Sequence, residues 1–125
     1  MDDDGKFILV YGTFPSVEVA EAIGAGLVEQ GLAACVNIFP GMISIYVWQG
    51  ARQREQEAAM LIKTRAALGE RVMAEVRRQH PYSTPALLVL PVSSGSPDFL
   101  AWIAAQTRAE ETPAEETRAE ETRAD

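Results

Sequence analysis

The sequence has little of what metal sites and catalytic sites are most often built from. Its 125 residues include one cysteine, Cys35, and one histidine, His80. A lone cysteine forms no disulfide within the chain, and without a C-x-x-C pair the metallochaperone and dithiol redox sites based on that motif are excluded. The phosphate-binding motifs G-x-x-x-x-G-K-[ST] and G-x-G-x-x-G are also absent. The chain has only one histidine for a serine–histidine–aspartate arrangement, and no such arrangement is recognisable in the sequence. We therefore expect no enzymatic activity.

The chain also lacks an excess of basic charge and any long apolar run. Its net charge is −7 at pH 7, so no basic stripe is available for a phosphate backbone, and we expect no nucleic-acid partner. No apolar run approaches the ~18 residues that indicate a membrane span. The first residues, MDDDGK, are acidic where a secretory signal would be basic. Together with the lone cysteine, these features predict a cytoplasmic protein that does not associate with membranes.

Both ends of the chain differ in composition from its centre. Residues 107–125 repeat the pattern TRAEE with no large apolar side chain. Such a segment has nothing to bury in a core, and we expect it to be a disordered acidic tail. We expect residues 1–6 to be disordered as well, and residues 7–106 to form one domain.

The domain alternates strand and helix patterns. Runs of β-branched and aromatic residues predict strands, whereas apolar residues spaced by four, with capping residues such as Ser16, Gly31 and Ser96, predict helices. The expected order is a strand at 7–14, a helix within 15–31, strands at 33–39, 42–48 and 54–65, a helix at 67–79, a strand at 86–92 and a helix within 96–106. This is a ferredoxin-like split βαβ sandwich of the α+β class, β-α-β-β-α-β plus a C-terminal helix.

The strand patterns within residues 33–65 predict one long antiparallel hairpin with a bend or bulge at Pro40-Gly41. Strands of up to ~15 residues exceed the usual length of about 5 or 6, so the hairpin is expected to project from the domain. It is apolar on both faces, with Ile43, Ile45 and Val47 opposite Tyr46 and Trp48. An exposed apolar ribbon with open edges promotes association, and we therefore predict an obligate oligomer formed through strand edges.

Several stretches together resemble the CutA family of divalent-cation tolerance proteins. They are LAACVNI with PGMISIYVWQG, the E-x-E-x-x-x-L-I-K-T segment at Glu55–Thr64, HPYSTPALLVLPV and DFLAWI, and the resemblance covers about residues 7–105. It implies a ferredoxin-like subunit with an extended hairpin, assembled as a homotrimer. It also implies a role in tolerance of copper or other divalent cations, with copper as a possible bound metal.

The metal ligands implied by the resemblance are only partly present. The proposed family ligands are a cysteine at the end of the first strand and two adjacent histidines before PY. These positions correspond to Gly12, Gln79 and His80 in this chain, so only the last ligand is kept. Ala86 also replaces a glutamate that is usual in the family. A single imidazole without a thiolate is a poor site for copper or zinc, which take three or four nitrogen or sulfur ligands.

For His80 the sequence leaves three interpretations open. It is a helix C-terminal residue whose imidazole meets the carbonyl end of the helix dipole, part of a ligand pocket between subunits, or a metal ligand with Glu57 as an oxygen donor. The ligand-pocket interpretation groups Glu57, Lys63, Tyr82 and Trp48 around His80 to hold a small polar or anionic ligand. The same residues also have structural interpretations, as a solvated strand edge, a packing tyrosine and an interface tryptophan.

The sequence thus predicts a non-enzymatic, cytoplasmic, homotrimeric protein of metal tolerance, with His80 as its candidate metal ligand. The alternative is a trimeric signalling module that resembles the nitrogen-regulatory PII proteins and binds a small ligand in clefts between subunits. A third interpretation is a stable scaffold without a ligand.

Overall fold

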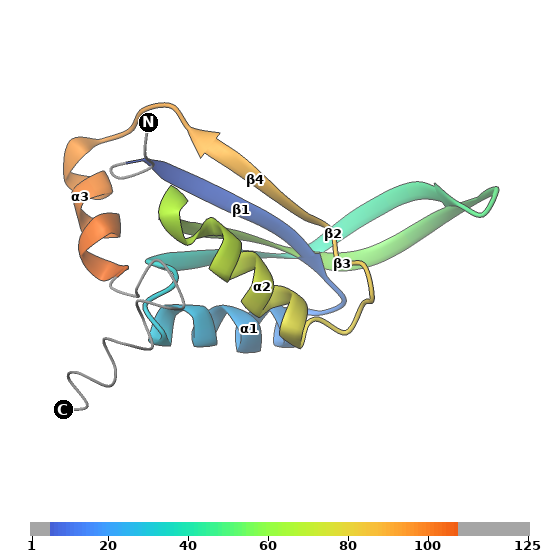
Figure 1. Ribbon diagram of the computed structural model, residues 1–125. Helices are drawn as coiled ribbons and strands as arrows, with labels where there is room; N and C mark the ends of the chain where they lie inside the picture. The colour runs from blue at the N-terminus through green and yellow to red at the C-terminus, as the bar shows by residue number, and fades with distance from the viewer. Residues whose placement is uncertain (1–5, 108–125) are drawn as a thin grey trace.

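The structure, a computed structural model, describes residues 6–107 and contains one four-stranded antiparallel sheet with strand order β2-β3-β1-β4 (Figure 1). Helices α1 and α2 lie against one face of the sheet. The elements are β1 Phe7–Phe14, α1 Val17–Glu29, β2 Cys35–Trp48, β3 Ala51–Arg65, the short 3₁₀ helix η1 Ala66–Leu68, α2 Gly69–Gln79, β4 Leu87–Val92 and α3 Pro97–Gln106. The predicted α+β ferredoxin-like order with a C-terminal helix is confirmed.

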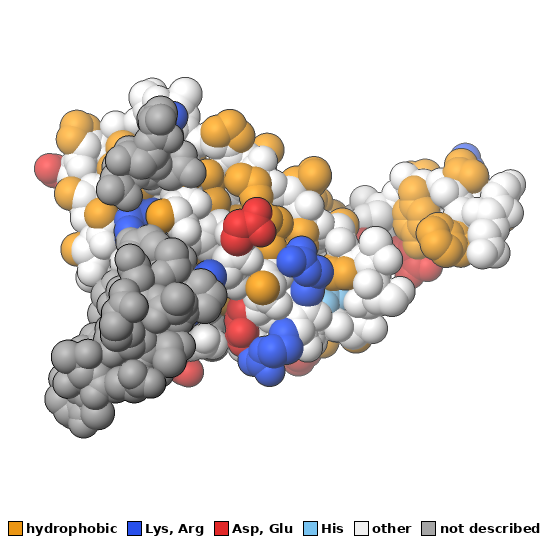
Figure 2. Space-filling view, viewed as in Figure 1, with side chains coloured by type: hydrophobic (Ala, Val, Ile, Leu, Met, Phe, Trp, Pro, Cys, Tyr) orange, Lys and Arg blue, Asp and Glu red, His pale blue; other side chains and the backbone are white. Residues whose placement is uncertain are grey.

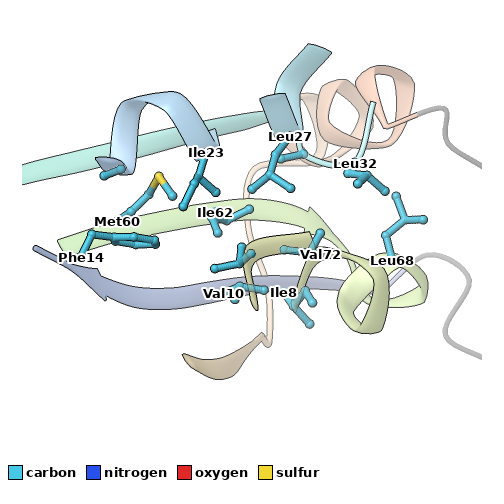
Figure 3. Close-up of a cluster of buried hydrophobic side chains, with 13 residues drawn as sticks. Ile8, Val10, Phe14, Ile23, Leu27, Leu32, Met60, Ile62, Leu68 and Val72 are labelled. Carbon is cyan, nitrogen blue, oxygen red and sulfur yellow. The ribbon is translucent and has the colours of Figure 1, made fainter. Parts of the chain in front are cut away.

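The hydrophobic core lies between the two helices and the sheet (Figure 3). Alternate residues of β1 face the helices, and Val10 and Phe14 among them are completely buried. Strand β3 contributes Met60 and Ile62, and α1 and α2 contribute apolar residues spaced by four, such as Ile23 and Leu27. This spacing places them on one side of each helix.

The ends of α1 follow the capping signals of its sequence. The Ser16 hydroxyl accepts a hydrogen bond from the Val19 amide at 3.2 Å, and Gly31 adopts a φ of 74° after the helix ends. Gly24 allows close approach to the sheet, because a Cβ there would lie 2.9 Å from both Met60 Sδ and Val36 Cγ2. At Gly26 the space is open, because a Cβ there would meet only the Gln30 side chain, at 3.7 Å.

Helix α3 lies at the end of the sheet away from the projecting hairpin (Figure 1). Ser96 caps it, as predicted, by accepting from the Phe99 amide at 3.4 Å. Of its apolar residues Phe99, Trp102 and Ile103, only Ile103 is buried. Phe99 and Trp102 stack on each other with ring centroids 5.7 Å apart and stay about two-fifths exposed.

The hairpin is confirmed as one long ribbon that extends beyond the rest of the sheet (Figure 1). Strand β1 ends opposite Ala58, so the preceding part of β3 pairs with β2 alone. We call residues 42–57 the arm and the remaining described residues the body. The register shifts between Phe39 and Met42, around the predicted Pro40-Gly41 irregularity. Gln49 and Gly50 turn the arm with φ angles of 51° and 80°, a hairpin turn that requires left-handed residues.

Two expectations concern the limits of this description. Among residues 6–107, no helix is long and apolar enough to cross a membrane. The expected disorder of residues 1–6 and 107–125 falls almost wholly outside the described residues. At the boundary Thr107 is buried, and its hydroxyl and carbonyl oxygens accept hydrogen bonds from the Arg65 guanidinium at 2.8 and 2.6 Å. The first residue of the tail is therefore part of the packed body.

Candidate functional site at the base of the arm

His80 lies where the arm leaves the body. It is the C-cap of α2, and its amide donates to the Val76 carbonyl at 2.8 Å. The following proline favours the extended backbone of His80, which ends the helix. The imidazole is 8% exposed and lies beside Phe14, with ring centroids 4.9 Å apart. The helix end thus turns its imidazole into the core, against the last residue of β1.

Both ring nitrogens of His80 are hydrogen bonded. Nε2 lies 2.7 Å from the Thr13 carbonyl oxygen, and Nδ1 lies 3.1 Å from the Tyr82 amide. A carbonyl only accepts and an amide N–H only donates, so the proton is on Nε2 and the Nδ1 lone pair accepts. This is a neutral imidazole that links the end of β1 to the loop after α2. The ring of His80 therefore does not make the expected contact with the carbonyl end of the helix dipole.

Tyr82 connects His80 to the arm. Its ring lies 4.8 Å from the imidazole, centroid to centroid, and its hydroxyl donates to Glu57 Oε2 at 3.1 Å. The other carboxylate oxygen of Glu57 accepts from the Ser44 hydroxyl at 2.8 Å. Partial burial, followed by the hydrogen bond to Glu57 and the nearby negative charges, raises the pKa of the Tyr82 hydroxyl above its ordinary value. The hydroxyl therefore stays protonated and continues to donate in mildly alkaline solution.

The two faces of the arm carry different chemistry. Opposed residues of antiparallel strands point to the same side, and the pairs Met42–Glu57, Ser44–Glu55, Tyr46–Gln53 and Trp48–Ala51 therefore make one face. The pairs Ile43–Gln56, Ile45–Arg54 and Val47–Arg52 make the other. We call the first the aromatic face and the second the aliphatic face. Acidic groups thus lie on the aromatic face and basic groups on the aliphatic face.

A cavity of about 530 Å³ lies between the aromatic face and the loop that follows His80. We call it the arm groove. The residues that line it are Tyr46, Trp48, Gln53, Glu55, Tyr82, Ser83 and Thr84. Figure 2 shows acidic side chains beside apolar ones on the arm, on the side of the body that carries the histidine. Of the residues predicted to form a ligand pocket, Trp48 and Tyr82 line the groove, and Glu57 lies beside it through its bond to Tyr82.

Lys63 is not part of this group. It shares the strand face of Glu57, but it lies six positions further along β3, roughly 20 Å at the rise of an extended chain. It pairs with Leu9 and Cys35 in the body, and its Nζ lies 5.3 Å from the centroid of the Phe99 ring. Without this ammonium group, the arm groove has no lysine or arginine in its lining, and the anionic ligand expected from the sequence has no cation to bind there.

The positions that depart from the family's proposed metal site are also resolved. Gly12 is buried, and a Cβ there would lie 3.1 Å from Leu87 Cδ2 and 3.2 Å from the Phe14 ring. Gln79 points its amide to the Glu75 carboxylate at 2.7 Å on the surface of α2. Within residues 6–107 no three or more histidine, cysteine, aspartate or glutamate residues lie close enough to hold a metal ion. Metal ligation by His80 stays a prediction, and in this subunit it would have to replace one of two hydrogen bonds.

The sequence interpretation missed several residues of the arm groove. Tyr46 was available from the alternation of β2, because it shares the parity of Trp48, and Gln53 was available from the alternation of β3, because it shares the parity of Glu55 and Glu57. Ser83 and Thr84 gave no such signal, since a loop has no periodicity from which to infer direction. A second cavity, of about 700 Å³, was also missed. Its apolar walls come from β4 and α2 at the end of the body away from the arm, with Val89, Pro91 and Met73 among them.

The family can now be assigned by comparison with known proteins. The family described as "CutA1 divalent ion tolerance protein" matches residues 8–106. Divalent-cation tolerance protein CutA of Pectobacterium atrosepticum is 40% identical over 101 residues, covering 81% of this chain and 92% of the relative. The Thermus thermophilus protein of the same name is 43% identical over 95 residues, covering 76% and 92%.

A solved structure shares the fold as well. The periplasmic divalent cation tolerance protein CutA of Archaeoglobus fulgidus superimposes with a TM-score of 0.79 at 40% identity, covering 82% of this chain and 99% of that one. The ferredoxin-like subunit, the projecting arm and these matches agree over the whole body. The chain belongs to the CutA family of divalent-cation tolerance proteins.

Proposed function

We propose that this protein acts in tolerance of divalent metal ions as a homotrimer in the cytoplasm, by binding metal and without catalysis. Its family is named for divalent ion tolerance, and that name denotes no enzymatic reaction. The single thiol, Cys35, favours a reducing compartment. Fractionation of the source cells, with the protein followed by antibody, tests the location. Recovery outside the cytoplasm contradicts it.

The observation that carries the trimer is the apolar surface that a single subunit leaves exposed. Besides the tyrosine and tryptophan of the arm, seven large apolar side chains on the arm, on β4 and on the adjoining part of β2 are at least two-fifths exposed: Phe39, Ile43, Ile45, Val47, Leu88, Val89 and Leu90. Strands β2 and β4 are the two edges of the sheet, so their outer hydrogen-bonding groups are available to another chain. Pairing of edges between copies satisfies these groups and covers the apolar side chains.

The metal contact is proposed between His80 and Glu57, for copper or another divalent cation. Both residues bond to Tyr82, His80 through Nδ1 and Glu57 through Oε2. A metal ion that enters between them takes the lone pairs that Tyr82 occupies, so the loop at residues 82–84 has to move. Nitrogen and carboxylate oxygen are accepted by both copper and zinc. Solvent or a neighbouring subunit supplies the remaining ligands.

Titration calorimetry of the metal-free protein with Cu(II) and Zn(II) tests this assignment. The variants His80→Gln and Glu57→Gln are each expected to weaken binding at least about tenfold, because each removes one of few ligands. Gln79→Ala, next to His80 but on the surface of α2, serves as the control. Light scattering is expected to give three times the chain mass of 13.6 kDa for all four proteins.

Each outcome has a separate meaning. Equal affinities in wild type and both variants contradict the ligand assignment but keep metal binding. No heat with either metal contradicts metal binding itself. A folded protein with the mass of one chain contradicts the trimer.

The arm groove favours a second candidate function, a PII-like signalling module that binds a small ligand. A cavity of about 530 Å³ falls within the range of small-molecule sites. A ligand at 100 times its dissociation constant stabilises a protein by roughly 2.7 kcal/mol, so a thermal-shift screen of metabolites detects it. A screen in which no compound moves the melting temperature contradicts this candidate and favours a scaffold without a ligand.

A further inference from the structure

The arm groove combines three aromatic rings with a carboxylate. Tyr46 and Trp48 come from β2 of the arm, Tyr82 from the loop after α2, and Glu55 from β3. In the single subunit Tyr46, Trp48 and Tyr82 are 42%, 61% and 38% exposed, so a ligand can reach these residues. Aromatic faces carry partial negative charge, and a set of them around one cavity attracts cations, above all those with a weakly hydrated surface.

The electrostatic environment of the groove agrees with this. Glu55 lines the groove, and Glu57 accepts a hydrogen bond from the Tyr82 hydroxyl at 3.1 Å. Burial and then these two carboxylates raise the pKa of Tyr46. Arg52 and Arg54 lie on the aliphatic face, where they pair with Val47 and Ile45. This face points away from the groove. The strand alternation thus removes the nearest positive charges from the site and leaves the negative ones.

The third ring is held in place from two sides. Tyr82 bonds through its amide to His80 in the body and through its hydroxyl to Glu57 at the base of the arm. Its ring also packs against the imidazole. A ring that is fixed before the ligand arrives costs little further ordering on binding. The buried His80, unexplained by metal chemistry within one subunit, has a role here as the support of this ring.

We infer that the arm groove binds an organic ammonium cation, with Tyr46, Trp48 and Tyr82 around the charged group and Glu55 as its counter-ion. Gln53, Ser83 and Thr84 supply polar groups for a hydroxyl or carbonyl elsewhere on the ligand. A hydrated divalent ion gains little from aromatic faces and needs more oxygen ligands than one carboxylate provides. An anion meets only negative charge in this groove. The inference gives a chemical class to the ligand of the second candidate function and does not depend on metal binding.

Calorimetric titration with choline tests it, with the neutral carbon analogue 3,3-dimethylbutan-1-ol as the matched probe. The two have almost the same shape and differ in charge. Choline is expected to bind at least about tenfold more tightly, because the neutral analogue lacks the attraction to the rings and to Glu55. Equal binding of the two probes overturns the inference. The absence of choline binding also overturns it, and that is the result expected if the arm of a second copy fills the groove.

Variants identify the groups that hold the cation. Tyr46→Leu and Glu55→Gln are each expected to weaken choline binding about fivefold or more. Tyr46→Phe keeps the aromatic ring and is therefore expected to bind choline almost as tightly as the wild type. Arg54→Gln on the aliphatic face is the control and leaves the affinity unchanged. Light scattering checks that each variant keeps its assembly. Unchanged choline affinity in both Tyr46→Leu and Glu55→Gln overturns the inference. A metabolite screen that finds only uncharged or anionic ligands supports the second candidate function but contradicts a cationic ligand.

Discussion

The body and the arm are built from the same strands but are stabilised in different ways. In the body, β3 lies between two other strands and beneath two helices, and Met60 and Ile62 are completely buried. A few residues earlier, the same strand pairs only with β2, and Ile45 and Val47 across from it are more than three-fifths exposed. The body therefore has a hydrophobic core of its own within one subunit, whereas the arm has none.

The largest effect is expected from opening the core of the body. Phe14→Ala is expected to lower the free energy of unfolding by about 3–5 kcal/mol, because Phe14 is completely buried and its ring supports both Gly12 and His80. Urea denaturation measures this loss. Val28→Ala, on the partly exposed side of α1, is the control and is expected to change it by less than about 1 kcal/mol. Similar losses at the two positions contradict the assignment of the core.

A charge on the arm is expected to act on assembly and leave the subunit fold intact. Ile45→Asp places a carboxylate at a position that is 65% exposed in one subunit, so the circular dichroism spectrum is expected not to change. If copies cover the aliphatic face, the buried charge weakens association at least about tenfold. Sedimentation at a series of concentrations measures this, with Ala25→Asp on α1 as the control. An unchanged mass distribution for Ile45→Asp shows that the aliphatic face is not at the interface.

The smallest effects are expected from pH, and they separate the two regions. In the body, the hydrogen bond from the Arg78 guanidinium is the main cause that lowers the pKa of Glu75. A lowered carboxyl pKa adds stability above its ordinary value of 4.5, and that stability is lost as the pH falls through the lower folded value. Glu75→Gln is therefore expected to lower the melting temperature by less than about 2 °C at pH 7 and to leave it unchanged near pH 2.

The arm, together with the Tyr82 loop of the body that contacts its base, is expected to respond at the alkaline end. The pKa values of Tyr46 and Tyr82 are raised, so the stability that their protonated hydroxyls contribute is present below pH 10 and is lost as the pH rises through the higher folded values. Tyr82→Phe is expected to remove part of this alkaline decline, and Glu21→Gln, at an exposed position of α1, to change neither end. A Tyr82→Phe profile identical to wild type above pH 10 contradicts the contact with Glu57.

The sequence predicted the fold well because its signals are local. Ser16 and Ser96 as caps, the four-residue spacing in the helices and the irregularity at Pro40-Gly41 each act within a few residues, and the structure contains all of them. The helix α3 was less predictable, because which of its apolar residues is buried depends on where the helix lies on the sheet.

The site was predicted in part. Trp48, Glu57 and Tyr82 meet around one region as expected, but Lys63 does not, because strand parity fixes a face and says nothing of distance along it. The protonation of His80 was beyond prediction, since it follows from the Tyr82 amide together with the carbonyl of Thr13, a residue 67 positions away in the chain. Tyr46 and Glu55 were within reach of strand alternation, from Trp48 on β2 and from Glu57 on β3.

The unlike faces of the arm have a consequence for symmetry. A two-fold contact sets a surface against itself, which for this ribbon would bring arginine against arginine or glutamate against glutamate. A contact that repeats head to tail joins two different surfaces of neighbouring copies, so like charges need not meet, and it ends only when the last copy returns to the first. The alternation of charge along sixteen residues of hairpin therefore favours a closed ring of copies over a pair.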